Sequence, residues 1–256
     1  MTLPVEASEF LRLPLHDRRC GQSELVGTEL TRLRLLADLV DVPTTVAFSA
    51  PLGLWRELAE AGELAGLSTA IDGPVSIRGW LCGAGTPEPR IEPAFNNLGP
   101  DTAPDTAIEI LGSLARRNVS DQRRLVLCVR RFVAPDATVQ VRLVPSDNRL
   151  DLLACWGMAE HLDEPLQYDQ LRLDIDDLSM RERWITDKPT ATMAALGGAQ
   201  TTQLPPAWRC APVLDDDTAR RIGAVCLAAL GRVRDCTELE FVLTGGALLA
   251  LRCRGR

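Results

Sequence analysis

The sequence contains few of the residues and motifs from which metal and phosphate sites are usually built. Histidine occurs only as His16 and His161, and none of the eight cysteines forms a C-x-x-C pair, so close spacing cannot assemble a zinc-type cluster. The G-A-G stretch at residues 83–85 runs directly into Thr86 and Pro87, and no G-x-x-x-x-G-K occurs. A dinucleotide loop and a P-loop are therefore not indicated.

Basic charge and long apolar runs are also missing. The formal net charge is -7 at pH 7 and the sequence pI is about 5.0, so the basic footprint of a nucleic-acid-binding protein is absent. No apolar run reaches the roughly 18 residues of a membrane span, and the N-terminus lacks the regions of a signal peptide. We therefore expect a cytoplasmic protein without membrane or nucleic-acid partners. Abundant arginine, alanine and leucine with little lysine are typical of a bacterial source with GC-rich DNA.

Residues 1–100 alternate helical and extended patterns. The spacing of apolar residues predicts helices over residues 24–39 and 52–67, and strands over residues 44–48 and 75–81. Turn-forming residues accumulate over residues 83–105, where we place a linker. The order helix, strand, helix, strand predicts a smaller α/β region of unknown type.

The region after the linker begins with helical and hairpin patterns. Capping residues and apolar spacing predict helices over residues 106–116 and 122–132. Two extended runs, 137–144 and 149–156, flank a polar turn at residues 145–148, which predicts a β-hairpin.

The last segment is interpreted as two strands and a helix. Residues 208–213 and 222–230 are apolar runs on either side of the acidic turn 215–217. Residues 234–250 begin with a capping pattern at Thr237 and continue with many apolar residues, which we interpret as an amphipathic helix.

These segments, in this order, resemble a GAF domain over residues 104–254. The strand L-D-L-L-A-C-W-G at residues 150–157 is similar to the family's second strand, and T-D-K-P at residues 186–189 is similar to the end of a family helix. The I-G-A-V-C-L stretch at residues 222–227 and the segment after Thr237 resemble its closing strand and helix. The resemblance implies an α+β fold, in which a GAF-like antiparallel sheet has flanking helices.

The resemblance also implies a pocket under the connection at residues 158–207. The family's pocket binds small molecules, and a cavity lined by apolar and aromatic groups is the usual form of such a site. The candidate lining residues for a ligand or cofactor of unknown identity are Trp156, His161, Tyr168, Ile175, Ser179, Trp184 and Trp208. Some members of the family bind haem, and a single histidine can ligate a haem iron, so the resemblance makes His161 a candidate haem ligand.

We expect from this resemblance a non-catalytic sensory or regulatory protein of bacterial signalling. It would bind a small-molecule ligand or a signalling protein partner, and form a homodimer through its terminal helices. Two alternatives stay open from the residues. One is a cysteine-dependent reductase of GAF fold that uses Cys155, Cys210 or both, and the other is a purely structural interaction module whose pocket is filled by side chains.

Overall fold

The chain forms an α+β protein with antiparallel sheets and flanking helices. The computed structural model describes residues 9–255 except 83–89, 118, 164–166, 196 and 234, and it leaves out the side chains of residues 90–94, 161 and 163. The chain divides into unit 1, Met1–Arg34 with Pro43–Phe132, and unit 2, Leu35–Val42 with Val133–Arg256. Sequence patterns placed the division at residues 83–105, which lie inside unit 1. In the described part of the chain, no helix combines the length and apolar character needed to cross a membrane.

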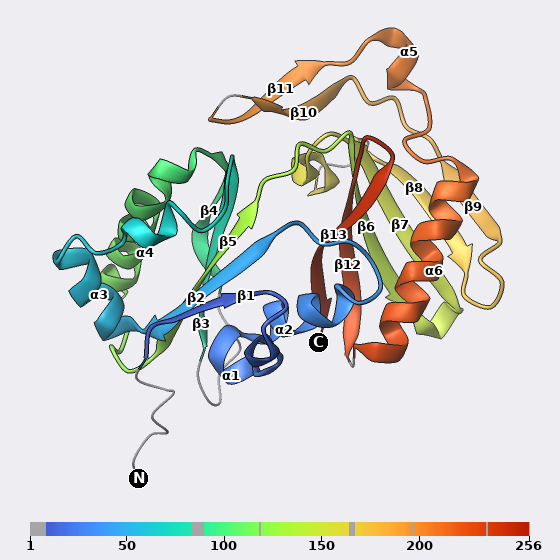
Figure 1. Ribbon diagram of the computed structural model, residues 1–256. Coiled ribbons are helices and arrows are strands. Elements are labelled where there is room, and N and C mark those ends of the chain that lie inside the picture. The colour runs from blue at the N-terminus through green and yellow to red at the C-terminus, as the bar shows by residue number, and fades with distance from the viewer. Residues whose placement is uncertain are drawn as a thin grey trace. The chain divides into compact units, whose positions relative to one another are not determined.

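Unit 1 is built on a five-stranded sheet with the order β1-β2-β5-β3-β4 (Figure 1). The strands are β1 (Leu11–Pro14), β2 (Thr45–Pro51), β3 (Val75–Cys82), β4 (Arg90–Leu98) and β5 (Arg124–Arg131). The strands predicted near β2 and β3 are confirmed. β5 lies at the centre, where Leu127 pairs with Phe48 on β2 and with Gly79 on β3.

The helix predicted for residues 122–132 was wrong, because these residues include the central strand β5. All side chains from Arg124 to Val129 are buried, on both faces of the sheet. A continuous apolar run of this kind has no alternation, so periodicity alone does not separate a central strand from a buried helix.

Helices cover both faces of this sheet. α3 (Leu52–Glu60) and α4 (Ala103–Arg116) pack on the face that carries Phe48 and Ile77. On the other face, the indole Nε1 of Trp80 donates a 2.8 Å hydrogen bond to the carbonyl of Val26, at the end of α1. The remaining helical elements of the region are α1 (Ser23–Val26), α2 (Thr28–Leu36), and the 3-10 turns η2 (Arg18–Gly21), η3 (Ala65–Leu67) and η4 (Pro100–Thr102).

Unit 2 contains a six-stranded antiparallel sheet with the order β13-β12-β6-β7-β8-β9 (Figure 1). The strands are β6 (Ala137–Val144), β7 (Arg149–Trp156), β8 (Asp169–Asp174), β9 (Met180–Trp184), β12 (Cys236–Thr244) and β13 (Ala247–Gly255). The hairpin predicted over residues 137–156 is confirmed as β6 and β7, joined by the turn η5 (Pro145–Asp147). The family helix that the resemblance placed before residues 186–189 is instead the edge strand β9.

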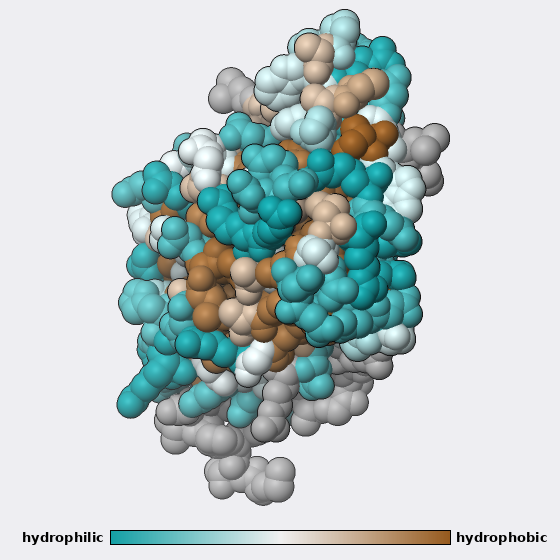
Figure 2. All heavy atoms as spheres, turned by 90° about the vertical axis from the view of Figure 1, so that its right-hand side faces the viewer, coloured by the Kyte–Doolittle hydropathy of each residue, from teal (hydrophilic) through white to brown (hydrophobic). Residues whose placement is uncertain are grey.

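One long helix, α6 (Asp216–Arg232), covers one face of this sheet, and the strand predicted for residues 222–230 was wrong. Asp215 is its N-cap and accepts a 2.7 Å hydrogen bond from the backbone N–H of Thr218, which lowers the pKa of Asp215. Buried positions recur every three or four residues along α6, as on a helix with one apolar face. Figure 2 shows the molecule from the side of α6 and β9, where an apolar patch is surrounded by hydrophilic residues.

The helix predicted for residues 234–250 was also wrong, because this segment contains β12 and the first part of β13. Gly245 and Gly246 both have positive φ, and together they form the two-residue connection of a β-hairpin. Residues 35–42, which also belong to unit 2, lie along the edge strand β13. There the backbone N–H of Ala250 donates a 2.9 Å hydrogen bond to the carbonyl of Asp41.

The segment between β9 and α6 forms a separate hairpin of β10 (Thr190–Ala195) and β11 (Gly198–Gln203), followed by α5 (Pro206–Arg209). The strand predicted for residues 208–213 was therefore wrong, because α5 ends at Arg209 and residues 210–213 are irregular. The hairpin meets the main sheet at Gly157, which bridges to Thr192. η6 (Ala159–Asp163) follows this contact.

We predict that Gly157→Ala destabilises the protein by roughly 2 to 4 kcal/mol. Gly157 has a φ of +71°, and an added Cβ would lie 2.2 Å from the carbonyl oxygen of Thr192. Gly197 is a matched control, because its φ is +73° but no atom lies within 4 Å of an added Cβ. Gly197→Ala should therefore cost only about 1 kcal/mol, from backbone strain. The free energy of unfolding in urea measures both, and equal losses would contradict the close contact at Gly157.

Candidate functional site

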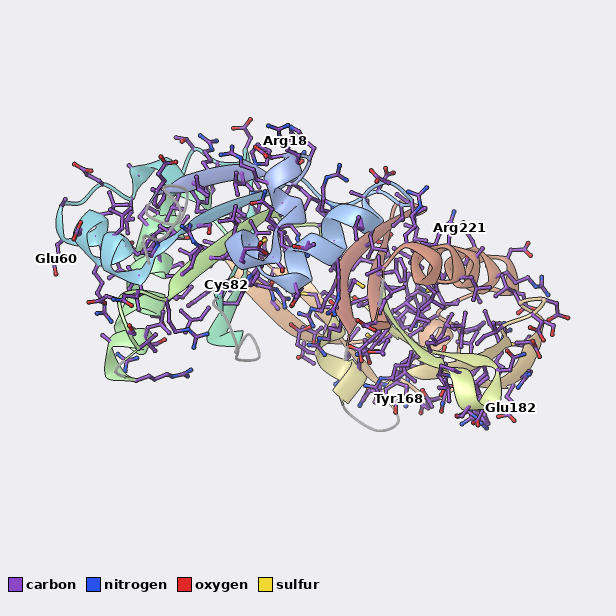
Figure 3. The ribbon with its side chains drawn as sticks, turned by 90° about the horizontal axis from the view of Figure 1, so that it is seen from below. Arg18, Glu60, Cys82, Tyr168, Glu182 and Arg221 are labelled. Carbon is purple, nitrogen blue, oxygen red and sulfur yellow. The ribbon has the colours of Figure 1, made fainter. Side chains whose placement is uncertain are left out.

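The face of the six-stranded sheet opposite α6 carries most of the sheet's charged side chains. The side chains that face α6 are apolar, as in the paired residues Val141, Leu152 and Leu171. Their neighbours along each strand point the other way, because successive side chains of a strand alternate between the faces. Figure 3 shows this arrangement, with Arg221 on α6 and Glu182 on the opposite side of the sheet.

Six directly paired residues on this face form a row of alternating charge across all six strands. In strand order from β13 to β9 they are Arg254, Glu238, Arg142, Asp151, Arg172 and Glu182. We call this set the charge row. Opposite charges directly across neighbouring strands stabilise a sheet, so the row is compatible with the register of every strand pair.

Ion pairs join most neighbours in the charge row. The carboxylate of Glu238 accepts hydrogen bonds from Arg254, at 3.0 Å, and from Arg142, at 3.2 Å. Arg172 lies 3.4 Å from Asp151 and donates to Glu182 at 2.6 Å. Each carboxylate therefore holds a guanidinium group in place.

The carboxylates at the centre of the row lie deeper than the guanidinium groups around them. The side chains of Glu238 and Asp151 are 14% and 16% exposed, whereas those of Arg142 and Arg254 are 55% and 42% exposed. Arg149 adds a second cation to Asp151, and this hydrogen bond raises the pKa of Arg149. The groups that face solvent at the β6–β12–β13 side of the row are consequently positive.

A second row of paired residues lies on the same face, two residues further along each strand. It contains Arg252, Glu240, Gln140, Leu153, Gln170 and Trp184. The Arg252–Glu240 ion pair, at 3.1 Å, is nearly buried. At the other end, the guanidinium of Arg172 stacks 4.6 Å from the ring centre of Trp184, as in a cation–π contact. The two rows together form what we call the polar face.

The carboxylates of the polar face do not fit a divalent cation held by the protein. Among residues 9–255, apart from the undescribed positions, no group of three or more histidine, cysteine or acidic side chains could hold a metal ion. Glu238, Glu240 and Glu182 each contact a guanidinium, which occupies the position that a cation would need. The face therefore offers a ligand guanidinium groups whose positions are fixed by ion pairs with carboxylates.

A second polar cluster lies in the interior of unit 2, at the start of β8. Asp169 and Lys188 form an ion pair of 2.5 Å, and their side chains are 0% and 1% exposed. Asp169 also accepts hydrogen bonds from the N–H groups of Thr186, at 3.0 Å, and Val213, at 2.8 Å. Lys188 is the only lysine of the chain, a signal that sequence reasoning missed. The cluster fastens the segments before β10 and before α6 to the sheet.

The structure divides the seven candidate lining residues among several places. Trp156 and Trp208 meet, with ring centres 4.9 Å apart and a 3.2 Å hydrogen bond from Trp156 Nε1 to the carbonyl of Trp208. Ile175 and Ser179 lie in the turn between β8 and β9, and Trp184 lies on β9 at the polar face.

The two remaining candidates lie beside the undescribed residues 164–166. The carbonyl of Tyr168 accepts a hydrogen bond from the hydroxyl of Thr186 at 2.9 Å. His161 belongs to η6, and its side chain lies outside the described residues.

The two cysteines considered for a reductase have different surroundings. Cys155 is buried, its thiol donates to the carbonyl of Met158, and burial raises its pKa to about 12. Cys210 is exposed, just after α5. A thiol with so high a pKa is not ionised at neutral pH, so Cys155 is unsuited to act as a nucleophile.

Comparison with known proteins gives matches to solved structures only. No family model and no curated protein matches the chain. The dinucleotide-forming acetyl-coenzyme A synthetase 1 of Ca. Korarchaeum cryptofilum, in complex with coenzyme A and Ca-AMPCP, is 11% identical with a TM-score of 0.46, over 89% of this chain and 92% of that chain. The VanG D-Ala:D-Ser ligase of Enterococcus faecalis is 13% identical with a TM-score of 0.39, over 88% of this chain.

A third match is the ATP-grasp ligase PsnB in complex with its minimal precursor, which is 13% identical with a TM-score of 0.32, over 94% of this chain and 54% of that chain. The chain spans about half the length of the VanG ligase and of PsnB, at 51% and 54%. At these identities and scores, the similarity defines neither a substrate nor a reaction for this chain.

These matches correct the expectations drawn from the GAF resemblance. The strands β12 and β13 replace the closing helix on which the resemblance depended, and the matched structures are a D-Ala:D-Ser ligase, an ATP-grasp ligase and a synthetase, not GAF domains. The identification as a GAF domain was wrong. The expectation of a non-catalytic signalling sensor depended on that identification and was wrong with it.

We predict that Lys188→Met destabilises the protein by about 3 to 5 kcal/mol, because it leaves the buried carboxylate of Asp169 without its cation. The control is Asp187→Asn, which removes the ion pair of Asp187 with Arg209 on the same segment. That pair is exposed to solvent, so its loss should leave the stability nearly unchanged. Urea unfolding followed by circular dichroism measures both variants. A small effect of Lys188→Met would contradict the fastening role of the pair.

Proposed function

We propose that the protein is an enzyme that binds a nucleotide, or another planar ligand carrying phosphate, on the polar face of unit 2. The observation that carries this proposal is the β6–β12–β13 end of the charge row, where the exposed guanidinium groups of Arg142 and Arg254 are held by the less exposed carboxylate of Glu238. The face would bind the ligand and orient it for reaction.

The positive end of the charge row has the chemistry of a phosphate site. Arg142 and Arg254 both donate to Glu238, so their guanidinium groups are fixed side by side above one carboxylate. A guanidinium presents a planar set of donors that matches the oxygens of a phosphate, and holding it in advance reduces the entropy lost on binding. The two groups together can contact adjacent phosphates of one ligand.

The opposite end of the polar face suits a planar group. Trp184 is 43% exposed, and Arg172 lies against its ring. Between this ring and the arginine pair lie Gln140 and Gln170, whose amides can both donate and accept hydrogen bonds. An aromatic ring stacks on a base, and amides recognise its polar edge.

Fixed guanidinium groups also provide a catalytic function. During transfer of a phosphoryl group, negative charge is spread over the phosphate oxygens, and preorganised cations stabilise that charge without rearranging. Arg142 and Arg254 are placed to do this at the phosphate end. Because the face does not fit a protein-held divalent cation, these arginines would supply the positive charge.

We predict that Arg142→Ala weakens binding of ADP and of a non-hydrolysable ATP analogue by tenfold or more, because one charge-assisted phosphate contact is lost. Isothermal titration calorimetry of the full chain measures the affinity, with and without magnesium. Glu238 keeps Arg254 as its partner in this variant, so the fold should persist. Release of phosphate from ATP by the wild-type protein, and its loss in the variant, would support catalysis.

Arg220→Ala is the matched control. Arg220 is an exposed arginine that pairs with Asp217 on α6, on the other side of the sheet. This variant should bind nucleotides like the wild type. Equal weakening by both substitutions would mean that only net charge matters, and absence of nucleotide binding by the wild-type protein would contradict the proposed function.

A further inference from the structure

A pair of cysteines lies inside the β12–β13 hairpin, on the face opposite the polar face. Cys253 on β13 is directly paired with Leu239 on β12, and both are buried. The register shifts between Cys236 and Glu238, and such a bulge changes the direction in which a side chain points. Cys236 is thereby turned to the buried face, where its Sγ lies 3.0 Å from the Sγ of Cys253.

The surroundings of this pair are mostly apolar and include a small recess beside Cys236. Cys226 on α6 and Cys236 line a recess between α6 and the sheet, together with Val141 and Leu239. Cys236 lines this recess and is 5% exposed, whereas Cys253 is 0% exposed, so Cys236 is the sulfur of the pair that an oxidant reaches first. Burial raises the pKa of Cys226, the third thiol in this region, well above its ordinary value.

We propose that Cys236 and Cys253 are a site of oxidative modification, at which a two-electron oxidant of the peroxide class forms a cross-strand disulfide. The first sulfur attacks a peroxide oxygen, the O–O bond breaks, and a sulfenic acid and one water result. The second sulfur attacks the sulfenic sulfur, the S–O bond breaks, and a second water leaves. In sum, two thiols and one hydrogen peroxide give one disulfide and two waters.

The geometry requires only a small movement. A disulfide has an S–S distance of about 2.05 Å, so the two sulfurs must approach each other by roughly 1 Å. Both residues lie in paired strands, and the partner sulfur is already in contact when the first becomes oxidised. The sulfenic acid would therefore be captured by its neighbour before it reacts further.

The disulfide would act on the strands that carry part of the polar face. Arg252 and Arg254 flank Cys253, and Glu238 follows Cys236 across the bulge. A cross-link at this position holds the register of β12 against β13 and so the spacing of these charged groups. It also closes a chain segment between residues 236 and 253, which restricts the unfolded chain and stabilises the fold.

Peptide mapping tests the proposal on the intact full-length chain. The reduced protein is treated with hydrogen peroxide, remaining thiols are alkylated under denaturing conditions, and the protein is digested with trypsin without reductant. Trypsin cleaves after Arg252, between the two cysteines, so the peptide 235–252 and the dipeptide Cys253-Arg254 stay together only when a disulfide joins them. We expect this linked species, lighter than the sum of the two thiol peptides by two hydrogen atoms, and its disappearance on reduction. Thermal unfolding of the oxidised protein should shift to higher temperature.

Variants identify the reacting pair. Cys253→Ser should abolish the linked species, whereas Cys226→Ser and Cys210→Ser should leave it unchanged. A wild-type digest that shows only separately alkylated peptides, or a link from Cys236 to Cys226 instead, would overturn the proposal. If Cys253→Ser does not fold, the wild-type digest decides the question alone, because it identifies both linked residues directly.

Discussion

The arrangement of unit 2 depends on a single buried carboxylate. Asp169 opens β8 and accepts from three donors at once, namely Lys188 and the N–H groups of Thr186 and Val213. A buried charge is tolerated only when it is paired and hydrogen-bonded, so all three donors must be in place together. The segment that enters β10 and the segment that enters α6 are thereby fixed to the same strand. The position of α6 over the sheet, and hence which face remains free, follows from this cluster.

Once α6 covers one face, the alternation of the strands determines the character of the other. Along β12, Leu239 and Phe241 point to the core, while Glu238 and Glu240 point to the polar face. The same alternation runs through the neighbouring strands, and the register brings each acid opposite a base. The bulge near Cys236 is an exception to strict alternation, since it turns a thiol into the core beside Cys253. One hairpin thus carries a charged surface on one side and a pair of contacting sulfurs on the other.

The sequence predicted the β6–β7 hairpin well and the C-terminal elements poorly. β6 and β7 were found because a polar turn separates two alternating runs. The same signal was present at Gly245 and Gly246, between runs with period two, but a capping pattern at Thr237 was given more weight. The apolar run at residues 222–230 was interpreted as a strand, although it is rich in alanine and leucine, which favour helices. The charge row could not be predicted, because it depends on the register of strands that are distant in sequence.

The Arg252–Glu240 pair is nearly buried, which distinguishes it from the more exposed ion pairs of the charge row. Removing two charges from water costs as much as their attraction returns, so an apolar pair at this position would hold β12 and β13 together at least as well. Stability therefore does not explain the pair. What it contributes is a fixed array of charge that continues into the charge row through the neighbouring pair of Glu238 and Arg254. The exposed ion pairs of the charge row add modestly to the stability of the sheet, and under the proposed function their fixed guanidinium groups would also contact the phosphate of the ligand.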